Sequence, residues 1–586
     1  MIFGVTRVVN FAHGSLFMLG AYIGFSIFSI LPREPVWFAA GVIGTGLFVA
    51  LLGVAMECTL LRRIYRAPEL FQLLATFGVV LMVQDATFWL WGPNDLAISR
   101  PPWMRGFVSI TGQRFPVYDL ILIAIGPAVL AALWLLMQRT RFGMLVRAAT
   151  EDRDMAAALG INQLGLFTAV FALGAGLAGM AGALSLPSSS ANPHLDLAVV
   201  VDAFVVVVVG GMGSVGGAFV ASLLIGLLQA FGIVLLPKIT LVLVFLVMAV
   251  VLTLRPHGLF GQPLLPVRGA HAVPVPIGPT PRAAKILGGA ALLAALAAPI
   301  FAGLYLLSVL TEAAIAVLFA GSLHVMMGPG GMASFGHAAW FGIGAYAVGL
   351  AVKFFAVPLP LGLALAPLAA GAVAAMFGWM VVRLSGVYLA MLTLAFAQIV
   401  WVMAFQWVEI TGGDNGILGV WPPATLGVRG YYLLSVTLCV GCALALRRIL
   451  RAPFGYALRA GRDSALRAEA IGLHTQRLRL VAVVIAGASA GLAGGVFTYA
   501  KGSVFPGYAA VGHSVDALLM VLLGGVQTLS GPVIGALAYT GLYDFLLART
   551  DSWRFVLGAI IVTLVLVFPD GIAGTVLRLH TGRRNR

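Results

Sequence analysis

Charged side chains are scarce in this sequence. Only 9% of its 586 residues are Asp, Glu, Lys or Arg, whereas 61% are hydrophobic. Soluble domains carry roughly a quarter charged residues, so this chain has too few polar groups to cover a water-facing surface. The composition excludes a soluble globular protein and predicts a protein integral to a lipid bilayer.

Lysine is nearly absent, and its placement excludes a common type of nucleotide site. A Walker A loop needs Gly-Lys followed by Ser or Thr at the start of a helix, where the loop holds phosphates. Pro, Ala, Val and Ala precede the four lysines, Lys238, Lys285, Lys353 and Lys501. The chain also has no Ser-His-Asp arrangement that would predict catalysis. We therefore expect no enzyme activity and no nucleotide site of this type.

Cysteine is also rare, with three residues in the chain. Cys439 and Cys442 have the Cys-x-x-Cys spacing of metal and redox sites. They lie within an apolar run without a second ligand pair, whereas a structural zinc needs four ligands. We expect neither a metal nor a cofactor.

Long apolar runs are abundant. A helix that crosses a bilayer needs about 20 apolar residues. Such runs occur at 36–60, 70–92, 118–138, 163–186, 215–236, 238–254, 285–308, 310–327, 357–382, 386–408, 431–446, 477–500, 530–548 and 552–568. With further shorter segments, the pattern predicts an all-α polytopic membrane protein with about 15 to 17 spans.

The sequence repeats itself. Asn10-Phe11-Ala12-His13-Gly14 returns as Ser334-Phe335-Gly336-His337-Ala338, and Gly143 to Arg147 returns as Gly455 to Arg459. These matches predict two homologous membrane halves, related by pseudo-two-fold symmetry along the membrane normal. A proline-rich segment separates them and is too rich in proline for a helix. The expected divisions are a half at 1–260, a cytoplasmic linker at 261–284, a half at 285–575 and a basic tail at 576–586.

The basic residues are mostly arginine and cluster beside the ends of the predicted spans. The net charge is +15. The positive-inside rule places the clusters at 139–153 and 447–467 and the C-terminal tail in the cytoplasm. Polar segments at 93–117 and 409–430 remain for the outer face. Because no aromatic residues alternate with these arginines, we expect no nucleic-acid partner.

Two polar segments, 140–162 and 452–474, stand between spans at matched positions. Each carries charged residues and alanine, and each ends in an apolar-Gly-apolar step that can end one helix and begin the next. Ordinary amphipathic loops would also be polar, but this pattern recurs between matching flanking motifs. We predict two cytoplasmic docking surfaces for partner subunits, which include Gly143, Arg147, Asp152, Gly160, Gly455, Arg459, Asp463 and Gly472.

These motifs resemble a known family. Gly-x-x-x-Arg-Ala, an acidic residue and then Ala-x-x-x-Gly-Ile/Leu resemble the cytoplasmic EAA-type loop of ABC importer permeases. Asn10 to Gly14 resembles the signature of the first permease subunit of branched-chain amino acid systems. Gly328 to His337 and Thr411 to Gly416 resemble the second subunit. The chain thus resembles a fusion of LivH-type and LivM-type permeases over nearly all of both halves.

The resemblance implies a permease in the lipid of a bacterial cytoplasmic membrane that works with two cytoplasmic ABC ATPase subunits and an extracytoplasmic substrate-binding protein. It implies a small-molecule substrate such as leucine, isoleucine or valine, although related permeases carry urea or short amides. The pattern departs from the family at Gln527, where Gly-Gly-x-Gly-Thr is usual. It also departs before Asn10, where the family has a complete helix. We expect about 25–35 further residues upstream, enough for one span.

The repeated halves fit a permease driven by separate ATPases, and they also fit a self-sufficient, ion-coupled secondary transporter. An ion-coupled secondary transporter can also contain internal repeats, and it would place ionisable groups in the middle of the membrane. The candidates, Glu57, Asp85, Asp202, Glu312 and Asp516, lie mostly near predicted span ends. An ion-coupled carrier also leaves the paired cytoplasmic segments unexplained.

The repeated histidine motif provides candidates for the translocation pathway. His13 and His337 each begin an apolar stretch, with Asn10 and Ser334 three residues before them. These side chains could line a pathway between the halves, or they could cap and pack a broken helix. The sequence alone leaves both roles open.

Overall fold

The computed structural model describes residues 2, 10–65, 67, 69–110, 112–237, 239–261, 282–568 and 571–575. Its regular structure is almost entirely helical. The described strands form two short antiparallel pairs, β1 (Phe107–Ile110) with β2 (Gln113–Pro116) and β3 (Ile417–Leu418) with β4 (Ser503–Val504). The prediction of an all-α polytopic membrane protein is confirmed, while the pseudo-two-fold symmetry stays a prediction.

The chain forms two compact units. Unit 1 comprises residues 1–225, 257–263 and 549–567. Its helices are α2 (Ala12–Ile30), α3 (Pro35–Met56), the π-helix η1 (Glu57–Leu61), α4 (Arg62–Ile64), α5 (Glu69–Trp91), the 3-10 turn η2 (Pro102–Met104), α6 (Val117–Arg139), α7 (Arg141–Glu151), α8 (Arg153–Ala158), α9 (Gln163–Ser185), α10 (Leu195–Gly210), the first part of α11 (Val215–Leu235) and α25 (Trp553–Val567).

Unit 2 contains the remaining residues. Its helices are the rest of α11, α12 (Thr240–Leu254), α13 (Arg282–Phe301), α14 (Leu304–Met327), α15 (His337–Phe355), α16 (Leu359–Val381), α17 (Gly386–Gln406), α18 (Val408–Thr411), η3 (Gly413–Asn415), α19 (Gly427–Arg451), α20 (Pro453–Asp463), α21 (Ala465–Ala470), α22 (Thr475–Lys501), η4 (Pro506–Ala509), α23 (Val511–Gly524) and α24 (Gly531–Leu547).

Among the described residues, 13 helices are long and apolar enough to cross a membrane, and four shorter apolar helices accompany them. Most predicted runs coincide with helices. The boundary expected near residue 309 is wrong, because α13 ends at Phe301 and α14 begins at Leu304 after an extended Gly303. Uniformly apolar sequence does not reveal that turn. Helices α2, α10, α15 and α23 are absent from the predicted runs. Asp202 interrupts the apolar stretch of α10, and Ser514 and Asp516 interrupt that of α23.

The two units contain the same close helix contact. In unit 1 a Cβ added at Gly20 of α2 would lie 2.4 Å from the Gly179 carbonyl oxygen of α9. In unit 2 a Cβ at Gly344 of α15 would lie 2.1 Å from the Gly491 carbonyl oxygen of α22. Small residues at such contacts let membrane helices pack backbone to backbone. The contact therefore builds the core of each unit from repeated sequence.

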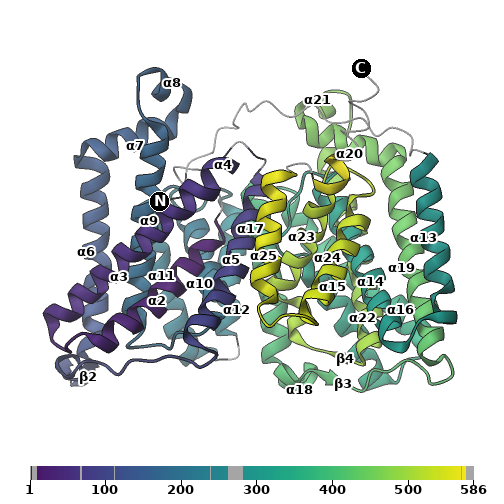
Figure 1. Cartoon of the computed structure of the whole chain (residues 1–586), viewed down its shortest axis with the longest axis horizontal. Helices are drawn as coiled ribbons and strands as arrows, with labels where there is room; N and C mark the ends of the chain where they lie inside the picture. Colours follow the sequence, from purple (N-terminus) through teal and green to yellow (C-terminus); the bar gives the residue numbers. More distant parts are fainter. Residues whose placement is uncertain are drawn as a thin grey trace. The chain divides into compact units, whose positions relative to one another are not determined.

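The units do not follow the order of the chain. Helix α25, close to the C-terminus, belongs to unit 1 and packs along α5 (Figure 1). Helix α12, from the first sequence repeat, belongs to unit 2 and packs against α17. Most of the linker expected at 261–284 and the whole tail at 576–586 lie outside the described residues, so the predicted divisions of the sequence stay predictions.

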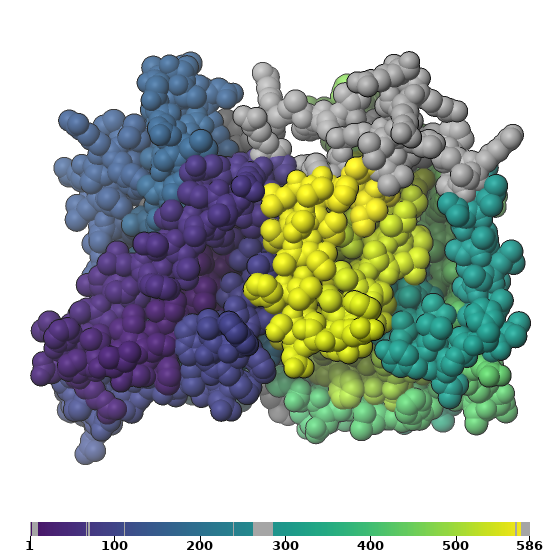
Figure 2. Space-filling model, viewed as in Figure 1, coloured from purple at the N-terminus to yellow at the C-terminus, as the bar shows by residue number. Residues whose placement is uncertain are grey.

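In each unit the predicted docking segment occupies one end. Figure 1 shows α7 and α8 beyond the ends of α6 and α9, with the β1–β2 hairpin at the opposite end of unit 1. In unit 2, α20 and α21 lie opposite α18, β3 and β4. The blue residues of α7 and α8 form a projection from their unit (Figure 2). The polar segments are therefore separated from the apolar helices that carry them.

Candidate functional site

Each docking segment is a pair of short helices joined by a capping residue. Asp152 ends α7 and caps α8 by accepting a hydrogen bond from the Met155 N–H at 3.0 Å. In unit 2 the same position is held by Ser464, which accepts from the Arg467 N–H at 3.4 Å. Such caps satisfy backbone donors that a helix start leaves free. Asp152 and Asp463, both predicted as docking residues, are therefore not equivalent, because the counterpart of Asp152 is Ser464.

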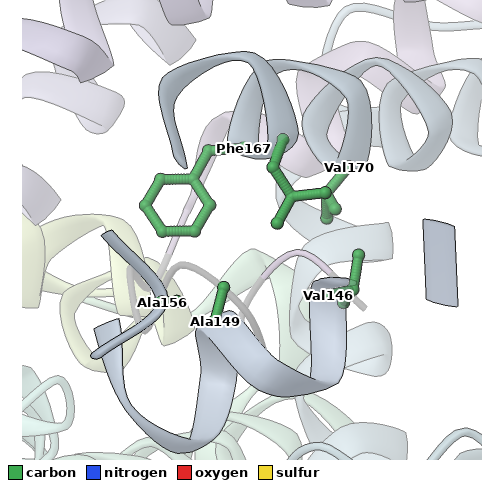
Figure 3. Close-up of a cluster of buried hydrophobic side chains, with 6 residues drawn as sticks. Val146, Ala149, Ala156, Phe167 and Val170 are labelled. Carbon is green, nitrogen blue, oxygen red and sulfur yellow. The ribbon is translucent and has the colours of Figure 1, made fainter. Parts of the chain in front are cut away.

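Buried apolar side chains attach the first docking segment to the membrane helices. Val146 and Ala149 of α7 and Ala156 of α8 face Phe167 and Val170 of α9 (Figure 3). All five are buried. The segment therefore has a small core of its own, through which a displacement of α7 and α8 would reach α9.

Glycine ends both segments in the same way. Gly160 and Gly472 adopt φ values of +80° and +89°, which side chains on L-residues rarely adopt. The following N–H groups, from Ile161 and Leu473, donate to the carbonyls of Ala156 and Ala468 at 3.1 and 3.0 Å. This is the hydrogen-bond pattern of a Schellman helix end. The predicted helix breaks at these two glycines are therefore present.

A glycine and an arginine form the corner that precedes each segment. A Cβ at Gly143 would lie 2.1 Å from the Met137 carbonyl oxygen, and Arg147 donates to that same carbonyl. A Cβ at Gly455 would lie 2.2 Å from the Leu450 carbonyl oxygen.

Arg459 uses that corner in unit 2. It donates to Leu450 O at 3.0 Å and to Gly455 O at 2.9 Å. Partial burial lowers the pKa of Arg459, although arginine stays protonated in proteins. Because a cation favourably meets the free carbonyls at a helix end, Arg147 and Arg459 fix the angle at which the docking segments leave α6 and α19.

Exposed apolar side chains stand at the tips of both segments. Leu159 is 75% exposed in unit 1, and its sequence equivalent Ile471 is 76% exposed in unit 2. Leu466 is 84% exposed and Met155 is 59% exposed. Large apolar side chains gathered on a polar projection favour a protein-binding surface. The charges predicted to mediate docking are thus accompanied by a hydrophobic contact surface.

The pathway candidates of unit 1 lie at the start of α2. Asn10 is buried, and its Oδ1 accepts from the Ala12 N–H at 3.0 Å. The Phe11 N–H donates to Thr76 Oγ1 at 3.4 Å. His13 is half-buried, and its Nδ1 has no hydrogen-bond partner among the described residues. Asn10 thus acts as a turn residue at this helix start.

The equivalent residues of unit 2 lie deeper. His337 is fully buried, and its Nε2 is 2.7 Å from Ser322 Oγ of α14. Ser334 is also fully buried. The Phe335 N–H donates to Thr393 Oγ1 at 3.1 Å, as Phe11 does to Thr76. This geometry favours the capping and packing alternative for His337, and the assignment of these residues to a pathway stays a prediction.

Sequence reasoning missed a buried polar cluster in unit 1. The carboxylate of Asp196, at the start of α10, accepts from Gln84 Nε2 at 3.1 Å and from Ser15 Oγ at 3.2 Å. All three residues are buried. The only signal is that each is a polar residue within or beside an apolar run, and the contact between residues so far apart in the chain is not visible in the sequence.

Four of the ionisable residues considered for ion coupling have specific partners. Glu57 of η1 accepts from Thr168 at 2.7 Å and pairs with Arg62 at 3.4 Å. Glu312 pairs with Lys501 at 2.6 Å. Asp516 accepts a hydrogen bond from the Tyr539 hydroxyl at 2.7 Å. Asp85 accepts one from the Phe555 N–H at 2.8 Å. The fifth candidate, Asp202, is exposed on α10. Among the residues that the structure describes, no group of three or more His, Cys, Asp or Glu could hold a metal ion.

The model of the family described as "Branched-chain amino acid transport system / permease component" matches residues 1–252 and again 305–565. The chain belongs to this family. The double match confirms that two permease domains are repeated in one polypeptide, and it identifies the chain as a transport permease and not an enzyme.

Individual relatives match one half each. The high-affinity branched-chain amino acid transport system permease protein BraD of Pseudomonas aeruginosa is 29% identical over 45% of this chain and 89% of its own length. LivH of Escherichia coli is 28% identical over 45% of this chain and 89% of its own length. LivM of Escherichia coli is 28% identical over 49% of this chain and 74% of its own length. No solved structure matches. The expected fusion of LivH-type and LivM-type permeases, a multi-pass protein of the bacterial inner membrane, is confirmed.

Proposed function

We propose that this chain is the membrane permease of an ABC importer for branched-chain or other hydrophobic amino acids. The observation that supports it most is the pair of docking segments, α7–α8 and α20–α21. Both have the same glycine–arginine corner, the same capped helix pair and the same left-handed glycine end. Two such segments fit two ATPase subunits, one on each. The names of the relatives support the amino acid substrate.

In this proposal the docking segments transmit force. An ATPase subunit that binds the exposed Leu159 or Ile471 would move the short helices as a unit. In unit 1 the Arg147 corner would pass this movement to α6, and the cluster around Phe167 would pass it to α9. An extracytoplasmic binding protein would deliver substrate at the opposite ends of the units. The chain supplies the pathway, while the ATPases supply the energy.

The ion-coupled alternative has less support in the structure. Glu57, Glu312 and Asp516 each bond to a partner within their own unit. Asp85 accepts from a backbone N–H instead of lying in an open path. These four carboxylates therefore have structural partners, which an ion-coupled carrier does not require.

Reconstitution tests the proposed function. The purified chain alone should hydrolyse no ATP, and proteoliposomes that contain the chain, its ATPases and its binding protein should accumulate leucine only when ATP is supplied. Uptake driven by a proton or sodium gradient without ATPases would refute the proposal. Competition with urea and short amides would separate the amino acid substrate from the alternative substrates of related permeases.

A further inference from the structure

Arg462 of α20 extends from the second docking segment to two other elements of unit 2. Its Nη1 donates to the Gly328 carbonyl at 2.8 Å and to Gln527 Oε1 at 3.2 Å. Its Nε donates to Asp463 Oδ1 at 2.9 Å. The Arg462 side chain is only 17% exposed. One guanidinium therefore joins three segments that are far apart in the sequence.

The loop that accepts from Arg462 connects α14 to the histidine-bearing α15. Gly328 follows the last residue of α14, and His337 begins α15. A Cβ at Gly331 in this loop would lie 2.5 Å from Cγ of Arg462. The loop therefore packs around the aliphatic part of Arg462, while its first carbonyl accepts from the guanidinium. A movement of α20 would pull directly on the start of this loop.

Gln527 lies in the turn between α23 and α24, and a second contact joins this turn to α14. The His324 Nε2 of α14 is 2.9 Å from the Val526 carbonyl oxygen, and both residues are buried. A Cβ at Gly328 would lie 2.7 Å from each of those two atoms. The end of α14 and the α23–α24 turn thus form one tightly packed body, to which Arg462 attaches the docking helix.

The first half of the chain lacks both side chains. At the offset that aligns the docking segments, Thr150 stands where the second half has Arg462. At the offset that aligns Gly210-Gly211 with Gly524-Gly525, Gly213 stands where the second half has Gln527. Thr150 Oγ1 donates to the Val146 carbonyl of its own helix at 2.7 Å. Glycine offers no side-chain acceptor, so the Arg462–Gln527 pair is specific to the second half.

We propose that Arg462 is a positioning residue that links the second docking segment to the α14–α15 loop and the α23–α24 turn, through an arginine–glutamine pair that the first half does not have at the matching positions. The inference rests on the proposed ATP-driven function. It assigns a role to Gln527, which replaces the usual glycine of the family motif. Through this link, displacement of α20 reaches the starts of α15 and α24 in unit 2.

Arginine suits this role for a chemical reason. Its planar guanidinium presents several donors in a fixed fork, so it can serve acceptors on two elements at once. A charged donor also strengthens each hydrogen bond to a neutral acceptor. Lysine would keep the charge but offers one rotating ammonium group, so it would hold the Gly328 carbonyl while losing part of the bond to Gln527.

The test measures how many substrate molecules are transported for each ATP hydrolysed by the complete importer in proteoliposomes. Arg462→Ala should lower this ratio about fivefold, Arg462→Lys should restore most of it, and Gln527→Ala should lower it about twofold. The affinity of the purified chain for its ATPase, measured in detergent, should stay within about twofold of wild type, since Arg462 points into its own unit. Gln527→Ala should add nothing in the Arg462→Ala background.

Three results would overturn the inference. The first is an unchanged transport ratio in Arg462→Ala. The second is a ratio that falls only as far as ATPase binding falls. The third is full additivity of the effects of Arg462→Ala and Gln527→Ala on the ratio. If Arg462→Ala is not recovered folded, an unchanged ratio in Gln527→Ala overturns the inference instead. Failure of the proposed function is distinguishable, because it appears in the wild-type importer as uptake that needs no ATP.

Discussion

Positions 160 and 472 require glycine because of their backbone conformation and not because of close packing. Both have φ near +80° to +90°, and a Cβ at either position would meet no atom within 4 Å. Space is therefore available for a side chain, but the left-handed backbone disfavours one. A substitution at either position therefore isolates the cost of the backbone conformation from the cost of a clash.

Gly472→Ala should destabilise the end of α21 by about 1–2 kcal/mol, the penalty of a left-handed conformation for an L-residue. The expected result is a lower thermal midpoint of the purified chain and weaker ATPase association. Gly441→Ala is the matched control, because Gly441 lies inside α19 with the same open space and no positive φ. Alanine should be neutral or favourable there. Equal effects at both positions would contradict the assignment.

Arg459 combines a charge on the docking segment with a structural role at its corner. Arg459→Ala removes the donors to Leu450 O and Gly455 O and should cost about 1–3 kcal/mol, as for hydrogen bonds to a charged group. The thermal midpoint of the chain without any ATPase measures this effect, and Arg459→Lys should be intermediate. A midpoint that does not move, together with lost ATPase binding, would mean that Arg459 acts only as a docking charge.

At the scale of elements, local motifs were predictable and distant contacts were not. The breaks at Gly160 and Gly472 follow from short-range backbone chemistry, and the sequence places them correctly. The pairing of Arg462 with Gly328 and Gln527 joins residues separated by 134 and 65 positions, so no sequence window contains it. The cluster around Asp196 was missed for the same reason.

Asp85 shows how an isolated membrane carboxylate can be structural. Its Oδ2 accepts from the Phe555 N–H in the first turn of α25, so it supplies from α5 the capping group that α25 needs. Asp85→Asn keeps an acceptor and should leave ATP-driven uptake within about twofold, while Asp85→Ala should cost about 1 kcal/mol of helix stability. Uptake assays and thermal midpoints of both variants measure this. Abolished uptake in Asp85→Asn would revive the ion-coupled interpretation.

At the scale of the whole molecule, the two compact units do not coincide with the two sequence repeats. The family model matches 1–252 and 305–565 as two domains. The compact units nevertheless place α12 with the second half of the chain and α25 with the first. Sequence repeats predict homologous segments, but they carry no information on which copy packs with which. Close contacts decide this, such as a Cβ at Gly558 that would lie 2.4 Å from the Gly78 carbonyl oxygen.

This exchange predicts how the chain behaves when it is divided within 262–281. The first fragment alone lacks α25, which leaves the Gly78 face of α5 without its partner, and the second alone lacks α12 on α17. Association of membrane helices depends on close packing of such small residues. Each fragment expressed alone should therefore aggregate, whereas the two expressed together should assemble and support uptake.

Size-exclusion profiles of tagged fragments measure this assembly. A flexible insertion at the same position, without a cut, is the control for disturbance of the linker and should leave the profile unchanged. Gly558→Leu should reduce assembly of the divided chain more than that of the intact chain, because the covalent connection raises the effective concentration of α25 at α5. A first fragment that is monodisperse alone, with the thermal midpoint of the intact chain, would show that α5 does not need α25.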